Sequence, residues 1–179
     1  MFVDTATLYP VSLADLVLRL AELGMFELLW SDHLLGEVER VLVQYKGLAA
    51  EQAAYFCACI RRAFPDGRVA PDEYLSLVAS RSGPDPDDHV HSAAAVAGRA
   101  TVVLSADKKG YPPADIAPAR RRDPDAFLTE LLRRYPHDVV GTVDAMGAAL
   151  REPLTRVQVL DRLAVAGVSK FVARVAALA

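Results

Sequence analysis

The sequence predicts an α/β fold with three layers, α/β/α, in which helices cover both faces of a central parallel sheet and a helical extension follows at the C-terminal end. Short apolar or β-branched runs alternate with longer segments of helical periodicity, and Gly, Pro, Asp or Ser marks each change. The strand runs are apolar on both faces, as in strands buried within a parallel sheet. Because residues 136–179 show helical periodicity alone, we expect one domain over residues 1–135 and an extension over residues 136–179.

The first half of the chain is expected to open with a strand. The apolar residues 2–3 suit a buried strand that ends at Asp4, and residues 5–10 suit a turn. Ser12 is the expected N-cap of a helix whose leucines follow at helical spacing until Gly24. The next elements are expected as a strand over residues 26–31, a helix continuing to about residue 45, and a helix over residues 49–64.

The second half contains the clearest loop of the sequence, SRSGPDPDD, at residues 80–88. Asp85 as N-cap and Pro86 at the first helical position begin an alanine-rich helix that reaches about Arg99. The other elements are expected as a short helix near residues 72–79, a strand over residues 101–104, a turn over residues 105–113, an edge strand over residues 116–121, a helix over residues 124–135, and helices broken at Pro153 and Gly167.

Composition narrows the class of protein. A chain of 179 residues and 19.4 kDa suits one domain with a modest appendage. No apolar run approaches the ~18 residues of a membrane span, and no signal peptide opens the chain, so we expect a cytoplasmic protein without a membrane partner. The net charge of −3 argues against a chain-wide electrostatic grip on nucleic acid but leaves local basic patches open.

Acidic residues fall where the elements of such a sheet meet. Asp4 ends the first strand, Asp88 lies in the first turn of a helix, and Asp107 follows the strand at residues 101–104. The carboxyl ends of parallel strands and the amino ends of the following helices share one edge, where ligands bind. Glu37, one turn past Asp32 in its helix, is expected to reach the same edge. The pattern therefore predicts four carboxylates in one pocket.

A cluster of ionised carboxylates needs a neutralising partner. Each close pair repels by a few kcal/mol at an effective dielectric constant of about 20, so protons or a cation must balance the charge. All-oxygen ligands select hard ions such as Mg²⁺ or Mn²⁺. The corresponding chemistry is hydrolysis of a phosphodiester by an activated water.

An ordinary structural role is also open for each of these acids. Asp4 could terminate its strand, and Asp88 could belong to a capping box at its helix N-terminus. Glu37 could pair with Arg40 one turn away, and Asp107 could be a turn residue. His89 and His91 are two residues apart on a helix and point in different directions, so zinc is not expected there.

Four spaced motifs together resemble a known family. They are FVDT with LYP at residues 2–10, WS before LLGEV at residues 30–38, DPDD at residues 85–88 before an alanine-rich helix, and VVLSAD at residues 102–107. In this order and spacing they resemble the PIN domain, and in particular VapC-type toxins with a helical C-terminal extension. The resemblance covers about residues 1–135, and residues 154–178 resemble the tail of that subgroup.

The resemblance implies a PIN-like fold and an endoribonuclease that depends on Mg²⁺ or Mn²⁺. It implies a metal site at Asp4, Asp88 and Asp107, with Glu37 as a further catalytic acid and Ser105 in the place of the family's threonine or serine. It also implies RNA such as tRNA or rRNA as substrate and an antitoxin protein as partner. Whether the chain forms a homodimer stays open.

Basic residues near these acids are candidates for contact with RNA phosphates, although a solvated face is the more ordinary explanation. They are Lys108, Lys109, Arg120, Arg121 and Arg122.

Two positions depart from the family pattern. Ala6 stands where the family commonly has asparagine, and Gly110 stands where it often has a further aspartate before an aromatic residue. Both departures remove groups that support a metal site, so a catalytically impaired PIN module that binds RNA or protein is the alternative function. A phosphatase with Asp4 as nucleophile is disfavoured, because the haloacid dehalogenase pattern needs a second acid at position 6.

Overall fold

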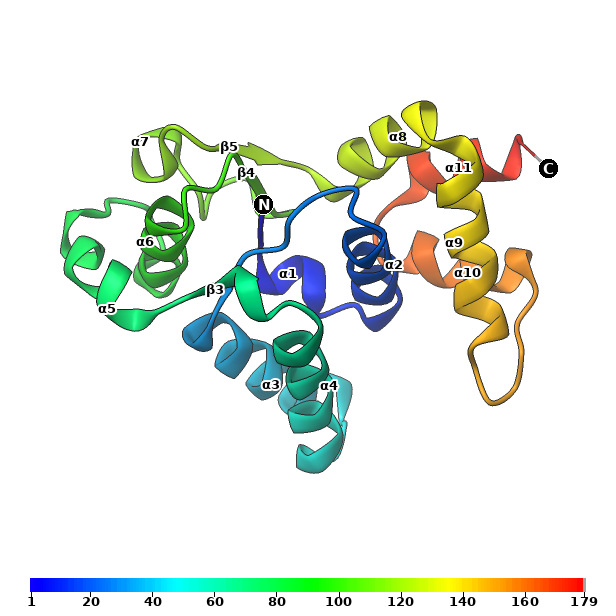
Figure 1. Cartoon of the computed structure of the whole chain (residues 1–179), viewed down its shortest axis with the longest axis horizontal. Coiled ribbons are helices and arrows are strands. Elements are labelled where there is room, and N and C mark those ends of the chain that lie inside the picture. The colour runs from blue at the N-terminus through cyan, green and yellow to red at the C-terminus, as the bar shows by residue number, and fades with distance from the viewer. Residues whose placement is uncertain (179) are drawn as a thin grey trace. The chain divides into compact units, whose positions relative to one another are not determined.

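The computed structural model describes residues 1–178 (Figure 1). The chain forms two compact units, one made of residues 1–9 and 26–122 and the other of residues 10–25 and 123–178. No helix in this described range is long and apolar enough to cross a membrane. The predicted boundary between residues 135 and 136 stays a prediction, although the units place residues 123–135 with the later helices.

Parallel strands form the centre of the first unit. β1 (Phe2–Val3), β4 (Val102–Leu104) and β5 (Arg120–Arg122) form one sheet in the order β1-β4-β5. β2 (Trp30–Ser31) and β3 (Arg68–Val69) form a second parallel pair. A parallel bridge between Phe2 and Leu29 lies beside β2 and joins the two ladders. The expected α/β class, with a parallel sheet and a helical C-terminal region, is confirmed.

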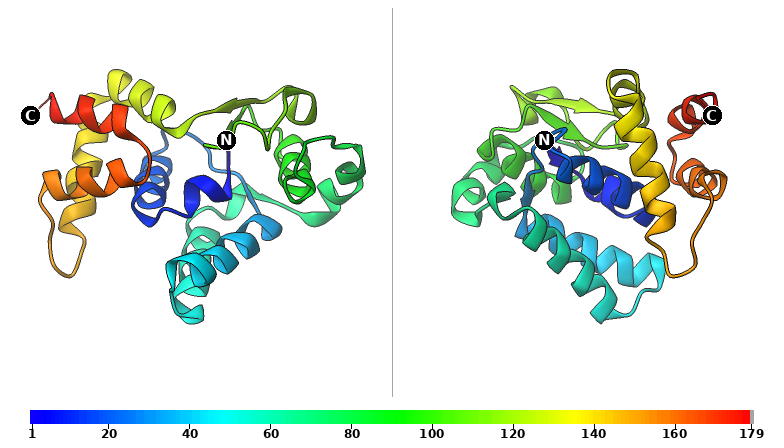
Figure 2. Two further views of the ribbon diagram at one scale, coloured as in Figure 1. Left: turned by 180° about the vertical axis from the view of Figure 1, so that it is seen from behind. Right: turned by 45° about the vertical axis from the view of Figure 1, so that its right-hand side comes forward.

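Helices surround these strands within the first unit. They are α1 (Thr5–Leu8), α3 (Asp32–Lys46), α4 (Ala50–Ala63), α5 (Pro71–Tyr74), α6 (His89–Ala97) and α7 (Pro113–Ile116), with 3-10 turns at Pro65–Gly67, Leu75–Ser80 and Pro86–Asp88. Helix α3 is well bounded, because the Ser31 side chain accepts a hydrogen bond from the Leu34 N–H and Gly47 ends the helix at φ +66°. Helices α3 and α4 lie side by side in both views of Figure 2.

The second unit is a helical bundle. It contains α2 (Val11–Glu22), α8 (Pro124–Arg134), α9 (Pro136–Ala148), α10 (Arg156–Val165) and α11 (Ser169–Ala176). The Asp125 carboxylate of α8 accepts the N–H groups of Lys170 and Phe171 at 3.1 and 2.7 Å, which satisfies donors at the start of α11. A bidentate contact between Arg156 and Asp144, at 2.7 and 2.6 Å, joins α10 to α9.

Two expectations near the N-terminus are wrong. Residues 5–8 form helix α1 instead of a turn, because the Asp4 carbonyl accepts the N–H groups of Thr7 and Leu8 at 3.0 and 3.1 Å and closes one helical turn. Helix α2 begins at Val11 with Pro10 as N-cap, whereas Ser12 was expected there. The Ser12 hydroxyl donates instead to the Arg162 carbonyl at 3.3 Å.

The strands are shorter than the apolar runs that predicted them. The strand expected over residues 26–31 is confined to β2, and the edge strand expected over residues 116–121 is β5, because α7 occupies residues 113–116. β3 was not predicted, because it contains only one buried apolar residue, Val69, beside the exposed Arg68, and so no apolar run marks it in the sequence. Pairing with β2, not hydrophobic periodicity, defines this strand.

Candidate functional site

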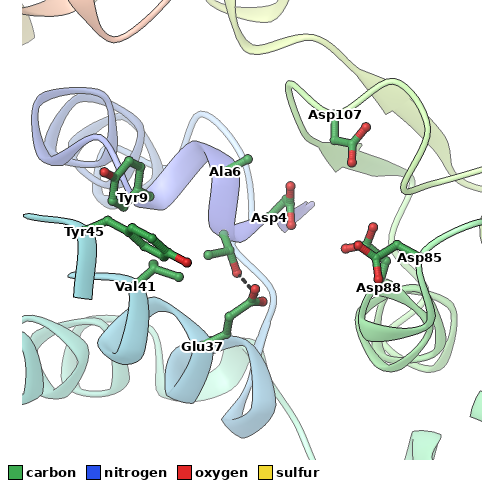
Figure 3. Close-up of a pocket in the computed structure, with 10 residues that line it drawn as sticks. Asp4, Ala6, Tyr9, Glu37, Val41, Tyr45, Asp85, Asp88 and Asp107 are labelled. Atoms are coloured by element: carbon green, nitrogen blue, oxygen red, sulfur yellow. Dashed lines mark hydrogen bonds between the residues drawn. The ribbon is translucent and has the colours of Figure 1, made fainter. Parts of the chain in front are cut away.

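One pocket in the first unit contains all four acids that the sequence singles out. Its volume is about 360 Å³, within the range of pockets that bind small ligands. Figure 3 shows these acids around the pocket, where they come from separate segments of the chain. The lining residues are Asp4, Thr5, Ala6, Tyr9, Glu37, Val41, Tyr45, Asp85, Asp88 and Asp107.

Asp4 and Asp107 reach the pocket from two neighbouring strands. β1 and β4 are parallel, with Val3 opposite Leu104, so the residues after both strands leave the sheet at the same end. The Asp4 N–H donates to the Leu104 carbonyl at 3.0 Å, which continues the ladder by one residue. The sheet register therefore brings these two acids together.

The Asp4 carboxylate is fixed by two hydroxyl groups. Ser105 donates to Oδ2 and Tyr111 donates to Oδ1, each at 2.6 Å, and Asp4 itself is only 5% exposed. Burial, and then the negative charge of Asp4, raises the pKa of Tyr111 well above its usual range. Tyr111 therefore stays a neutral donor at physiological pH and holds Asp4 in one orientation.

Asp88 stands at the N-terminus of α6, yet its side chain makes no capping hydrogen bond. Capping falls to Asp85, whose carboxylate accepts the Asp87 N–H at 3.0 Å. Burial, followed by repulsion from Asp4, Asp85 and Asp107, raises the pKa of Asp88 to about 6. At neutral pH this carboxylate is ionised although burial and the neighbouring acids disfavour its charge. A cation in the pocket would offset the repulsion between these acids.

Gly110 provides the space that Asp88 and Asp107 share. A Cβ at position 110 would lie 2.3 Å from Oδ2 of Asp88 and 2.9 Å from Oδ2 of Asp107. Real Cβ atoms do not approach other atoms this closely, so any side chain here would force the carboxylates to move. Both acids therefore reach the same point above the backbone because residue 110 is glycine.

Glu37 is held at the α3 side of the pocket by two short hydrogen bonds. Its Oε2 accepts from the Thr5 hydroxyl at 2.8 Å and contacts His91 Nε2 at 2.7 Å. The expected pairing with Arg40 is present but longer, at 3.7 Å. The hydrogen bond to His91 outweighs the effect of burial and lowers the pKa of Glu37, so this acid is ionised at neutral pH.

Two family models match the chain. A model of the PIN domain matches residues 1–109, more than half of the chain. The chain belongs to the PIN-domain family. A second model, the VapC50 C-terminal domain, matches residues 124–177, which confirms the resemblance to VapC-type proteins with a C-terminal extension. No curated protein and no solved structure matches the chain.

The basic residues proposed for RNA contact lie outside the lining of this PIN-domain pocket. Lys108 and Lys109 are exposed in the turn after Asp107, and the Lys109 N–H donates to the Asp107 carboxylate at 2.7 Å. Asp107 is therefore a turn residue as well as a pocket residue. In β5, Arg120 is exposed, while Arg121 donates to the Ser105 carbonyl at 2.7 Å. Contact of RNA with these residues and with Arg122 stays a prediction.

The donor set of the PIN-domain pocket fits a hard divalent cation. Among residues 1–178, no three His, Cys, Asp or Glu side chains stand as a preformed metal-binding group. The carboxylates that face the space above Gly110 nevertheless supply only oxygen, which Mg²⁺ and Mn²⁺ prefer over softer ligands. Asp4, Asp88 and Asp107 would hold such an ion, and its charge would offset the repulsion that contributes to the raised pKa of Asp88.

Several supporting residues of the site were not predicted from sequence. His91, only 3% exposed, reaches Glu37 across α6 and α3, and its role depends on how those helices pack. Asp115 of α7 accepts the N–H groups of Ser82 and Gly83, both at 2.7 Å, and so anchors the loop before Asp85. Burial opposes ionisation of Asp115, but these hydrogen bonds lower its pKa overall.

Proposed function

We propose that the chain is a divalent-metal-dependent endoribonuclease and the toxin component of a type II toxin–antitoxin pair. The observation that carries the proposal is the convergence of Asp4, Glu37, Asp88 and Asp107 on one pocket, with the pKa of Asp88 raised to about 6. The presence of both a PIN domain and a VapC50 C-terminal domain in one chain supports the toxin assignment.

Each acid has a separate task in this proposal. Asp4 keeps one orientation because Ser105 and Tyr111 hold its two oxygens. Asp88 is ionised at neutral pH although burial and then repulsion from other acids raise its pKa, so positive charge entering the pocket would stabilise its ionised form. Glu37 is already ionised and accepts a hydrogen bond from the attacking water. A Mg²⁺ or Mn²⁺ ion held by these acids would neutralise charge at the phosphate and would lower the pKa of the attacking water.

The two departures from the family pattern have different consequences for activity. The carboxylates of Asp88 and Asp107 occupy the space that a side chain at position 110 would fill. Carboxylate oxygens are therefore present where the family often has a further aspartate. At position 6 the alanine side chain lines the pocket and supplies no hydrogen bond. Ala6 therefore favours the alternative, a catalytically impaired module, more strongly than Gly110 does.

Cleavage of RNA by the purified protein tests the proposal against this alternative. We expect total RNA to be cut in Mn²⁺, no cutting in EDTA, and loss of cutting by orders of magnitude in Asp4→Asn. Glu51→Gln, an exposed acid in the first turn of α4, is the matched control and should cut at the wild-type rate. Attack by water predicts linear phosphomonoester ends, whereas attack by the RNA 2′-hydroxyl would leave 2′,3′-cyclic phosphates. RNA binding without cutting by the wild type would support the impaired module instead.

The partner and substrate class form the finer part of the proposal. We infer RNA such as tRNA or rRNA as substrate, in the cytoplasm, and an antitoxin that inserts a basic segment into the acidic pocket. Such a pocket is complementary to an arginine, which offers planar bidentate donors. If a small protein is encoded next to this chain, its co-expression should give a complex and relieve toxicity. Unchanged toxicity and no complex would remove the toxin assignment.

A further inference from the structure

The pocket has two chemically different ends. Asp85, Asp88 and Asp107 lie at one end, whereas Tyr9 and Tyr45 lie at the other, as Figure 3 shows. Aromatic side chains are large apolar surfaces that proteins bury where they can, yet Tyr45 is 63% exposed. The proposed nuclease chemistry uses only the acidic end, so the tyrosine end has no role in it.

One face of α3 connects the two ends. Glu37, Val41 and Tyr45 are spaced by four residues and all line the pocket, so they form a row along the helix. Eight residues of α-helix span about 12 Å along the axis. A ligand whose phosphate lies at the acids would therefore pass Val41 and reach the Tyr45 ring after a short stretch of extended chain.

Positive charge accompanies the aromatic end. The Lys46 ammonium lies 4.5 Å from the centre of the Tyr9 ring, a cation–π contact that positions both side chains. Lys46 is exposed, so its charge is accessible at this end of the pocket. An exposed ring beside an accessible cation matches single-stranded nucleic acid, in which bases stack on aromatic side chains and phosphates contact basic ones.

We propose that Tyr45 is a base-stacking subsite for single-stranded RNA, occupied by a base near the scissile phosphate while Lys46 contacts a flanking phosphate. The inference rests on the proposed ribonuclease function, which it extends from the acids to the nucleotide beside them. RNA is favoured over a protein segment because the same pocket continues into the acids that act on the phosphodiester. Stacking accepts any base, so this subsite positions the strand without fixing its sequence.

The test combines removal of the ring with removal of the bases. Binding of a fluorescein-labelled decamer of adenosine nucleotides is measured by anisotropy, in EDTA and at low ionic strength, for the wild type, Tyr45→Ala and Tyr45→Phe. The same proteins are measured with a decamer of the same backbone that lacks bases. Tyr55→Ala is the matched control, because Tyr55 of α4 is 67% exposed and does not line the pocket.

We expect Tyr45→Ala to bind the adenosine decamer about 5- to 100-fold more weakly than the wild type. Tyr45→Phe and Tyr55→Ala should stay within about twofold of it, since neither removes a stacking ring from the pocket. The decamer without bases should bind the wild type and Tyr45→Ala equally, because no base is left to stack. Circular dichroism melts check that each variant is folded. We expect all of them to fold, because the substituted residues are exposed.

Four results would overturn the proposal, and they differ in what they say of the ribonuclease. Stacking is excluded if Tyr45→Ala binds the adenosine decamer as tightly as the wild type does. It is also excluded if the variant loses the same affinity for both decamers. Neither result contradicts the nuclease function. Failure of the wild type to bind or cut any RNA removes the proposed function and this inference together. If Tyr45→Ala binds RNA as the wild type does but no longer binds a co-expressed partner protein, this surface binds a protein segment and not a base.

Discussion

Replacement of Asp88 by asparagine tests the electrostatics of the pocket without metal or substrate. Asp88 is a half-buried carboxyl that makes no capping hydrogen bond and is repelled by Asp4, Asp85 and Asp107. Asparagine has nearly the same shape and removes the charge. In EDTA at neutral pH the variant should therefore be more stable than the wild type, whereas loss of an ordinary capping residue would make it less stable.

The size and pH dependence follow from the pKa. A rise from 3.8 to about 6 corresponds to at most about 3 kcal/mol, which solvent screening at a half-buried site reduces to about 1–2 kcal/mol. Because the folded carboxyl holds its proton more tightly than the unfolded one, the wild type loses stability as pH rises from 3.8 through about 6. The advantage of Asp88→Asn should thus be full above that window and absent below it.

Urea unfolding in EDTA across this pH range measures the difference directly. Asp161→Asn, an exposed acid on α10, is the matched control and should unfold as the wild type does at every pH. Added Mn²⁺ should stabilise the wild type more than Asp88→Asn, because an ion stabilises only as far as it binds the native state. A variant that is less stable at neutral pH, or a difference that does not change with pH, would refute the reasoning.

Three further predictions concern residues around the acids. Gly110→Ala should weaken Mn²⁺ binding in calorimetry with little change of stability in urea, because its Cβ would displace the carboxylate ends of Asp88 and Asp107, whereas Gly141→Ala in α9 has open space and should change neither. His91→Leu should cost about 1–2 kcal/mol at pH 7, an effect that fades as pH falls below 4.5 through the lowered pKa of Glu37. Asp115→Ala leaves two loop N–H groups without their acceptor and should speed their hydrogen exchange.

Each of these has a result that would contradict it. Equal Mn²⁺ binding by the Gly110→Ala and Gly141→Ala proteins would show that the acids can move aside without disturbing a cation site. A His91→Leu effect that persists undiminished at pH 3 would assign it to packing and not to the ionised Glu37. Unchanged exchange at Ser82 and Gly83 in Asp115→Ala would mean that the loop is held by other contacts.

The positions of the acids could be predicted because they follow from sheet geometry. Asp4 directly follows an apolar run, Asp107 comes shortly after another, and parallel strands end at one edge, so their proximity needs no knowledge of side-chain packing. Asp88 was predictable in the same way from the loop and Pro86 that precede its helix. The roles of these acids and of Ser105 stay predictions, since only their placement is observed.

The groups that support the acids could not be predicted in this way. His91 was set aside because residues two apart on a helix diverge, yet its contact with Glu37 arises between helices. Tyr111 lies in an irregular turn, where no periodicity indicates which side chain points inward. Helix α1 was missed because four residues carry too weak a periodic signal, while its stability comes from the Asp4 carbonyl.

Binding of Mn²⁺ to the purified protein tests the central claim most directly, namely that the acids of one pocket form a divalent-cation site. Calorimetric titration at neutral pH should show one or two Mn²⁺ ions bound to the wild type and to Glu51→Gln. Asp88→Asn should bind them more weakly, and the double variant Asp4→Asn with Asp88→Asn should not bind them at all. Absence of binding to the wild type at millimolar Mn²⁺, or equal binding by the double variant, would contradict the account.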